Sequence, residues 1–127
     1  MEVFLHKICG QPVQPPVSMQ LRRCTPEQAP AVYALQNEVR AAMPHPEQFV
    51  PDTLENITAY LTGDLCLGVY DGARLGAYFI LRYCGQSEHN YAAFPGVPKS
   101  QWNHWANADS AIVHPDWRGN GLQRAPP

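Results

Sequence analysis

The sequence lacks long apolar runs, clustered basic residues and paired-cysteine motifs. No stretch approaches the roughly 18 apolar residues that a membrane helix needs, so we expect no membrane partner. Scattered Lys and Arg number 9 against 11 Asp and Glu, and the formal charge of -2 disfavours nucleic acid. The 4 cysteines show neither C-x-x-C nor zinc-finger spacing. We therefore expect reduced thiols, no metal and a cytoplasmic location.

The first 18 residues contain one short apolar patch and then Pro12, Pro15 and Pro16. This segment is too short and polar for a secretory signal, so we expect a disordered leader at 1–18. The prolines leave open a polyproline II ligand for a partner. A length of 127 residues fits one small domain, which we place at 19–127.

A first strand is predicted at 19–24. After it, the apolar residues have the spacing of a helix. Thr25 and Gln28 have the spacing of a capping box, but Pro30 leaves open a helix start near Ala29. The apolar residues of this helix share one face and precede two prolines: Val32, Leu35, Val39 and Met43.

A second helix is predicted at 52–62, and a hairpin follows it. Apolar strands at 65–70 and 74–83 flank Asp71-Gly72, a strong two-residue turn signal. The polar stretch 84–107 is predicted to be a long loop that contains a short tryptophan-bearing helix. A last buried strand is predicted at 108–113.

This last strand runs into a turn that contains Gly119 and Gly121. Glycines permit positive φ and close approach of a ligand, so several backbone N–H groups of the turn can converge on one anion. Arg118 adds a positive charge beside them. A P-loop is excluded because no Gly-Lys-Ser/Thr is present, and a dinucleotide fingerprint because the third glycine is missing.

The segment V-H-P-D-W at 113–117, followed by R-G-N-G-L-Q at 118–123, resembles the pyrophosphate-binding motif of the GNAT superfamily of N-acyltransferases. Gln123 departs from the family pattern, which has Gly or Ala there. The resemblance covers 19–124 and implies an α+β fold with a twisted, mainly antiparallel sheet flanked by helices. Pro126 interrupts the helix that should follow, so we expect this domain to be incomplete at its C-terminus.

The resemblance also implies an activity and its site. Acetyl-coenzyme A would be the co-substrate, and a primary amine of a small molecule or peptide would attack its thioester directly in a ternary complex. Asp109 is the candidate general base, and Glu88, His89 and His104 would border the acceptor. The coenzyme-binding candidates are Ala111, Ile112, Val113, Arg118, Gly119, Asn120, Gly121, Leu122 and Gln123.

Two alternatives to an active enzyme stay open at this point. One is a non-catalytic GNAT-like module that pairs through an open sheet edge at 111–113 as a homo-oligomer. The other is an inert truncated remnant. No residue is assigned as general acid.

Overall fold

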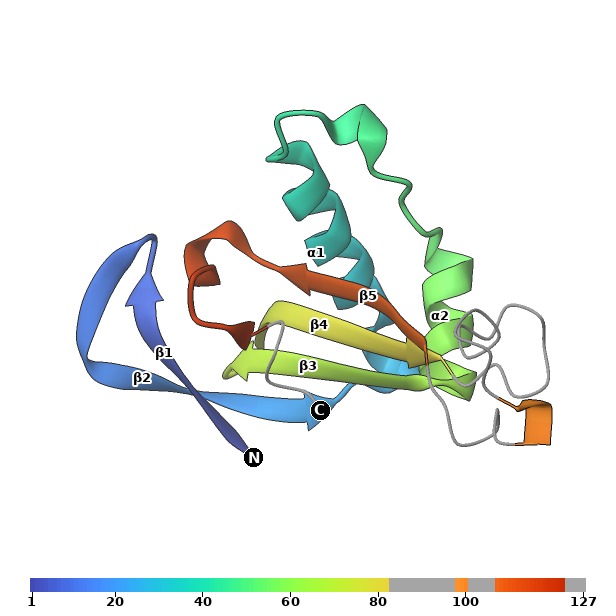
Figure 1. Cartoon of the computed structure of the whole chain (residues 1–127), viewed down its shortest axis with the longest axis horizontal. Helices are drawn as coiled ribbons and strands as arrows, with labels where there is room; N and C mark the ends of the chain where they lie inside the picture. The colour runs from blue at the N-terminus through green and yellow to red at the C-terminus, as the bar shows by residue number, and fades with distance from the viewer. Residues whose placement is uncertain (83–97, 101–106, 123–127) are drawn as a thin grey trace.

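The computed structural model describes residues 1–82, 98–100 and 107–122. An antiparallel sheet in the order β1-β2-β3-β4-β5 has two helices on one face (Figure 1). The mixed α+β class is confirmed. The elements are β1 Glu2–Ile8, β2 Gln11–Arg23, α1 Ala29–Ala41, α2 Leu54–Gly63, β3 Leu65–Asp71, β4 Arg74–Arg82 and β5 Asn107–Val113.

The expected disordered leader is wrong, because residues 1–18 form β1 and most of β2. A two-residue turn joins these strands, and Cys9 and Gly10 both have positive φ, 52° and 76°. This combination is typical of the tight turns that match the twist of a hairpin. The strand predicted at 19–24 is the end of β2, which pairs with β3 from Gln20 to Arg23.

The first helix begins at Ala29, the later of the two predicted starts. A single 3-10 turn, Pro26–Gln28, precedes it, and the side-chain Oε1 of Gln28 accepts the Thr25 N–H at 2.7 Å. Pro30 is tolerated because the first helical turn needs no backbone donor there. The predicted face is confirmed for three residues, since Val32, Leu35 and Val39 are buried.

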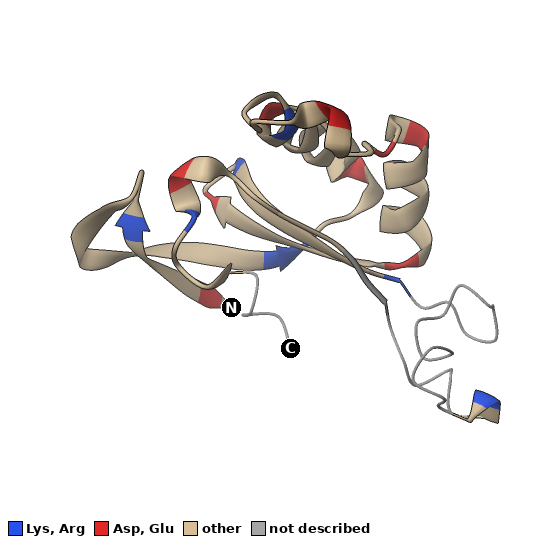
Figure 2. Cartoon of the chain, turned by 45° about the horizontal axis from the view of Figure 1, so that its top comes forward, with Lys and Arg blue, Asp and Glu red and all other residues tan. Residues whose placement is uncertain are grey.

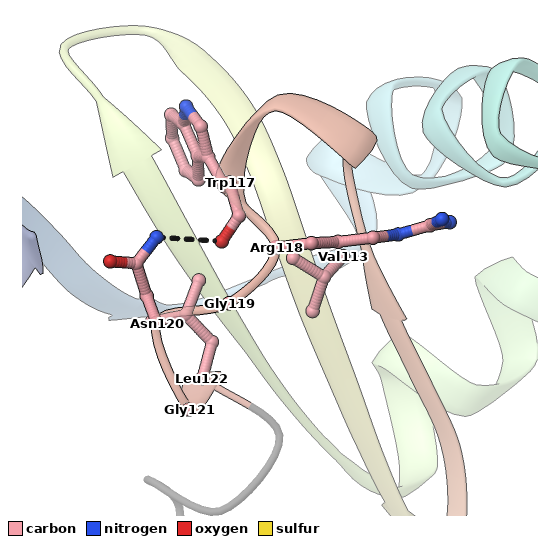
Figure 3. Close-up of a pocket in the computed structure, with 7 residues that line it drawn as sticks. All are labelled: Val113, Trp117, Arg118, Gly119, Asn120, Gly121 and Leu122. Carbon is pink, nitrogen blue, oxygen red and sulfur yellow. Dashed lines mark hydrogen bonds between the residues drawn. The ribbon is translucent and has the colours of Figure 1, made fainter. Parts of the chain in front are cut away.

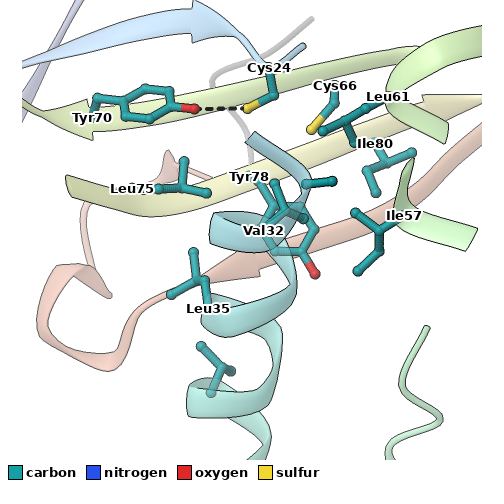
Figure 4. Close-up of a cluster of buried hydrophobic side chains, with 12 residues drawn as sticks. Cys24, Val32, Leu35, Ile57, Leu61, Cys66, Tyr70, Leu75, Tyr78 and Ile80 are labelled. Carbon is teal, nitrogen blue, oxygen red and sulfur yellow. Dashed lines mark hydrogen bonds between the residues drawn. The ribbon is translucent and has the colours of Figure 1, made fainter. Parts of the chain in front are cut away.

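The helices cover one face of the sheet and enclose a core (Figure 4). Within it the Cys24 thiol and the Tyr70 hydroxyl lie 3.2 Å apart. Burial raises the pKa of the Tyr70 and Tyr78 hydroxyls. The buried residues of this core are Cys24, Ala29, Val32, Leu35, Val39, Ile57, Leu61, Cys66, Tyr70, Leu75, Tyr78 and Ile80.

The opposite face of the sheet has a second core that reaches from β1 to the segment after β5. Trp117 is its largest member and lies against Gly76 of β4, where an added Cβ would meet the indole at 2.3 Å. Gly76 thus provides the space for the Trp117 ring. The buried residues of this core are Leu5, Met19, Val69, Ala77, Phe79, Val113, Trp117 and Leu122.

The hairpin predicted around Asp71-Gly72 is confirmed as β3 and β4, with Gly72 at a φ of 59°. β5 pairs with β4 and, among the described residues, is an edge strand of the sheet. No helix in the described ranges is long and apolar enough to cross a membrane.

Candidate functional site

The residues after β5 form a turn that lines a cavity of about 460 Å³. Gly119 and Gly121 have φ of 84° and 69°, so both adopt the left-handed conformation that the sequence pattern predicts. Figure 3 shows the turn with its lining residues as sticks. The cavity is lined by Val113, Trp117, Arg118, Gly119, Asn120, Gly121 and Leu122.

The backbone of this turn offers hydrogen-bond donors. The N–H groups of Trp117 and Arg118 donate to the carbonyls of His114 and Pro115. Within the described part of the chain, no group accepts from the N–H groups of residues 119–122. Successive backbone N–H groups without an acceptor can donate hydrogen bonds to an anion such as a diphosphate. The neighbouring glycines have no side chain that would block the anion.

Two predicted contact residues have buried side chains. Val113 and Leu122 are 5% and 3% exposed and belong to the core that contains Trp117. Both side chains pack in this core and hold the turn on the sheet. The turn is therefore attached to the body of the protein through its apolar side chains.

Asn120 has a role that the sequence did not indicate. Its Oδ1 accepts the N–H groups of His6 at 2.7 Å and Lys7 at 3.0 Å, and its Nδ2 donates to the carbonyls of Lys7 and Trp117, each at 2.9 Å. The side chain of this candidate coenzyme-binding residue thus joins the turn to β1. No local signal could reveal this, because the partners lie at the other end of the chain.

Positive side chains lie near the turn. Arg118 is exposed and extends away from Asn120 and Leu122 in Figure 3. Arg74 of β4 lies over the Trp117 ring, with its Cζ 5.9 Å from the ring centroid. Figure 2 shows the positive end of β1 on the same side of the molecule as the turn.

His114 connects the start of the turn to α1. Its Nδ1 accepts the Asp116 N–H at 3.1 Å, so Nε2 carries the proton that is donated to Glu38 Oε1 at 2.8 Å. The His114 N–H also donates to the Gly76 carbonyl at 2.8 Å. These contacts agree with the structural role that the sequence interpretation assigns to His114.

A second cavity, of about 240 Å³, lies beside β5 under the segment between the helices. Gln36, which is 1% exposed, holds this segment through two hydrogen bonds to the backbone of Asp52. The Asp52 carboxylate helps to raise the pKa of Tyr78, after burial of the ring. The cavity is lined by Gln36, Phe49, Val50, Asp52, Tyr78, Ser110, Ala111 and Ile112.

The candidate base Asp109 lies in β5 where the pairing with β4 shifts from Ile80–Ser110 to Leu81–Ala108. Its side chain, Gln123, Glu88, His89, His104 and the tryptophan-bearing helix lie outside the described residues. Among the residues that are described, no group of three His, Cys, Asp or Glu could hold a metal ion.

Comparisons with protein-family models, curated proteins and solved structures found no match for this chain. The assignment of a function therefore depends on the geometry of the turn and of β5.

Proposed function

We propose that this chain binds acetyl-coenzyme A at the glycine turn and belongs to the GNAT-type N-acyltransferases. The observation that carries the proposal is the set of backbone N–H groups at 119–122, combined with positive φ at Gly119 and Gly121. A diphosphate would accept from these amides, and Arg118 would offset its charge. The cavity of about 460 Å³ lies in the range of small-molecule sites.

The edge strand β5 extends from this turn toward the second cavity. The arm of the coenzyme that carries the thioester contains amide groups, and in an extended conformation it could pair with β5 from Val113 to Ser110. At the rise of about 3.3 Å per strand residue, this part of β5 is about 10 Å long. The thioester would then lie beside Ser110 and Ile112, which line the second cavity. This arrangement brings the acyl group to a space where an acceptor amine can bind.

The transfer itself would be direct. The amine nitrogen attacks the thioester carbonyl, a C–N bond forms, the C–S bond breaks, and the thiolate leaves and takes up a proton. A carboxylate accepts the proton that the amine loses. Asp109 is the residue that we propose for this step, and Asp52 in the second cavity is an alternative carboxylate.

Calorimetric titration of acetyl-coenzyme A into the 127-residue chain tests the proposal. We expect binding to the unmodified chain and its loss in Gly119→Glu/Gly121→Glu, because the new carboxylates would occupy and repel the diphosphate. Gly63→Glu is the matched control, since nothing lies within 4 Å of a Cβ at that helix end. Absence of binding to the unmodified chain would contradict the proposal. Release of free thiol on addition of amines then tests turnover.

One observation favours a second, non-catalytic function. Among the strands that the structure describes, β5 lies at an edge of the sheet, and Ala111 on it is exposed while Ile112 is half-buried. Such an edge can pair with a second copy of the chain. A dimer in light scattering that dissociates in Ala111→Lys would support pairing, and a monomer at all concentrations would exclude it.

A further inference from the structure

The amino-terminal strand is held against the glycine turn in a defined register. Asn120 makes three hydrogen bonds to the backbone of His6 and Lys7, and the Cys9 N–H donates to the Asp116 carbonyl at 2.7 Å. Leu5, fully buried, anchors the same strand in the core that contains Trp117 and Leu122. The position of Lys7 relative to the turn is therefore set by both polar and apolar contacts.

An irregularity of the hairpin lies between Leu5 and Lys7. In a regular strand Leu5 and Lys7 would share a face, but Leu5 is buried and Lys7 is exposed. Between them the pairing jumps from Leu5–Val17 to Lys7–Pro12. Irregularities of this kind commonly redirect a side chain.

The Lys7 side chain lies next to Gly119. A Cβ built on Gly119 would be 3.7 Å from Lys7 Cδ, which is ordinary van der Waals contact. The ammonium is two bonds beyond Cδ, so it lies within reach of an anion held by the turn. The acidic residue of the turn, Asp116, has its Oδ2 3.7 Å from His114 Nδ1.

We propose that Lys7, contributed by β1, is a second cationic binding residue for the diphosphate of coenzyme A. This inference rests on the proposed function and adds to it a residue from the opposite end of the chain. The flexible methylene stem would let the ammonium approach the phosphate oxygens, while Arg118 acts from the other side of Gly119.

Titration calorimetry with coenzyme A compares the full chain with Lys7→Gln, Lys7→Arg and Lys99→Gln. We expect Lys7→Gln to weaken binding about fivefold, the effect of losing one exposed ionic contact. Lys7→Arg keeps the charge and should stay within about twofold of the unmodified chain. Lys99→Gln removes the same charge from the segment at the far end of the molecule in Figure 1, and should leave affinity unchanged.

Coenzyme A without its 3′-phosphate is the second probe, and it should show the same loss in Lys7→Gln. A loss confined to the intact coenzyme would overturn the assignment to the diphosphate. Equal affinity of Lys7→Gln and the unmodified chain would overturn the inference while leaving the proposed function supported. If the unmodified chain binds neither probe, the proposed function itself fails. Far-UV circular dichroism verifies that each variant is folded.

Discussion

The hairpin β3–β4 lies in the middle of the sheet, whereas the hairpin β1–β2 lies at its edge. Six consecutive residues of β4, from Leu75 to Ile80, are buried because both faces of this strand are covered. In β1 only Leu5 is fully buried, and most of its neighbours are exposed. The central hairpin thus depends on apolar contacts along its whole length, and the edge hairpin on a few anchor points.

The anchor points of the edge hairpin lie far away in the sequence. Asn120 Oδ1 accepts a hydrogen bond from the N–H of Lys7, a residue 113 positions away in the sequence. Trp117 and Leu122 pack in the same core as Leu5. The edge hairpin and the candidate coenzyme site therefore stabilise each other. A substitution in either region should therefore change the stability of the other, and denaturation or hydrogen exchange can measure this effect.

One of the two largest effects is expected from Gly76→Val in the central hairpin. The new side chain would collide with the Trp117 indole, since even a Cβ would lie 2.3 Å from it. We expect a loss of about 3 kcal/mol in the free energy of unfolding, measured by urea denaturation. Gly63→Val, at an unobstructed helix end, is the comparison, and an equal loss there would contradict the steric explanation.

The edge hairpin is tested by Leu5→Ala. Removing this fully buried side chain should cost about 3 kcal/mol, because it leaves a cavity between β1 and the rest of the core. Phe4→Ala, at a neighbouring position that is 47% exposed, should cost much less. If urea denaturation showed small and equal losses of unfolding free energy for Leu5→Ala and Phe4→Ala, β1 would not be packed on the rest of the protein.

The link between the two regions is tested by Asn120→Ala. Its four hydrogen bonds would be lost, and we expect destabilisation of about 2 kcal/mol because bonds of one side chain are not additive. Hydrogen exchange should show faster exchange of the His6 and Lys7 amides. Unchanged exchange at these amides would show that Asn120 does not hold β1.

Tyr78, one of two buried tyrosines of the central hairpin, should produce a pH dependence. Burial raises the pKa of Tyr78 above its ordinary value of 10.0, so the folded protein keeps the proton that the unfolded chain loses above about pH 10. Stability from this group is complete below pH 10 and decreases above it, by up to about 1.4 kcal/mol per pH unit. Tyr78→Phe should reduce this decrease, whereas Tyr33→Phe, on the exposed face of α1, should not.

The smallest effects are expected at the two hairpin turns. Gly72→Ala and Gly10→Ala each place a Cβ on a residue with positive φ, at a cost of about 1 kcal/mol. Neither position has an atom within 4 Å of the new Cβ, so the cost is conformational in both turns. A markedly larger loss in one turn, measured by thermal or urea unfolding, would show that the two turns are not equivalent.

Local signals predicted most of the helical layer and the central hairpin. Gln28 acts as the capping-box partner of Thr25, and the β3–β4 turn falls one residue later than the predicted Asp71-Gly72 pair, at Gly72 and Ala73. The edge hairpin was missed because its prolines argue against a strand and Cys9-Gly10 is a weaker turn signal. The alternation of Val17, Met19 and Leu21, all at least half-buried, was the signal that could have revealed β2.

By itself the sequence determined which segments become helix, central hairpin and glycine turn, since these depend on the conformational preferences of neighbouring residues. Gly119 and Gly121 belong to this group. Only the tertiary structure decided that β1 lies against the turn, that Trp117 packs on Gly76 and that Lys7 lies beside Gly119. These contacts join residues that are distant in the chain, and no local preference encodes such pairs.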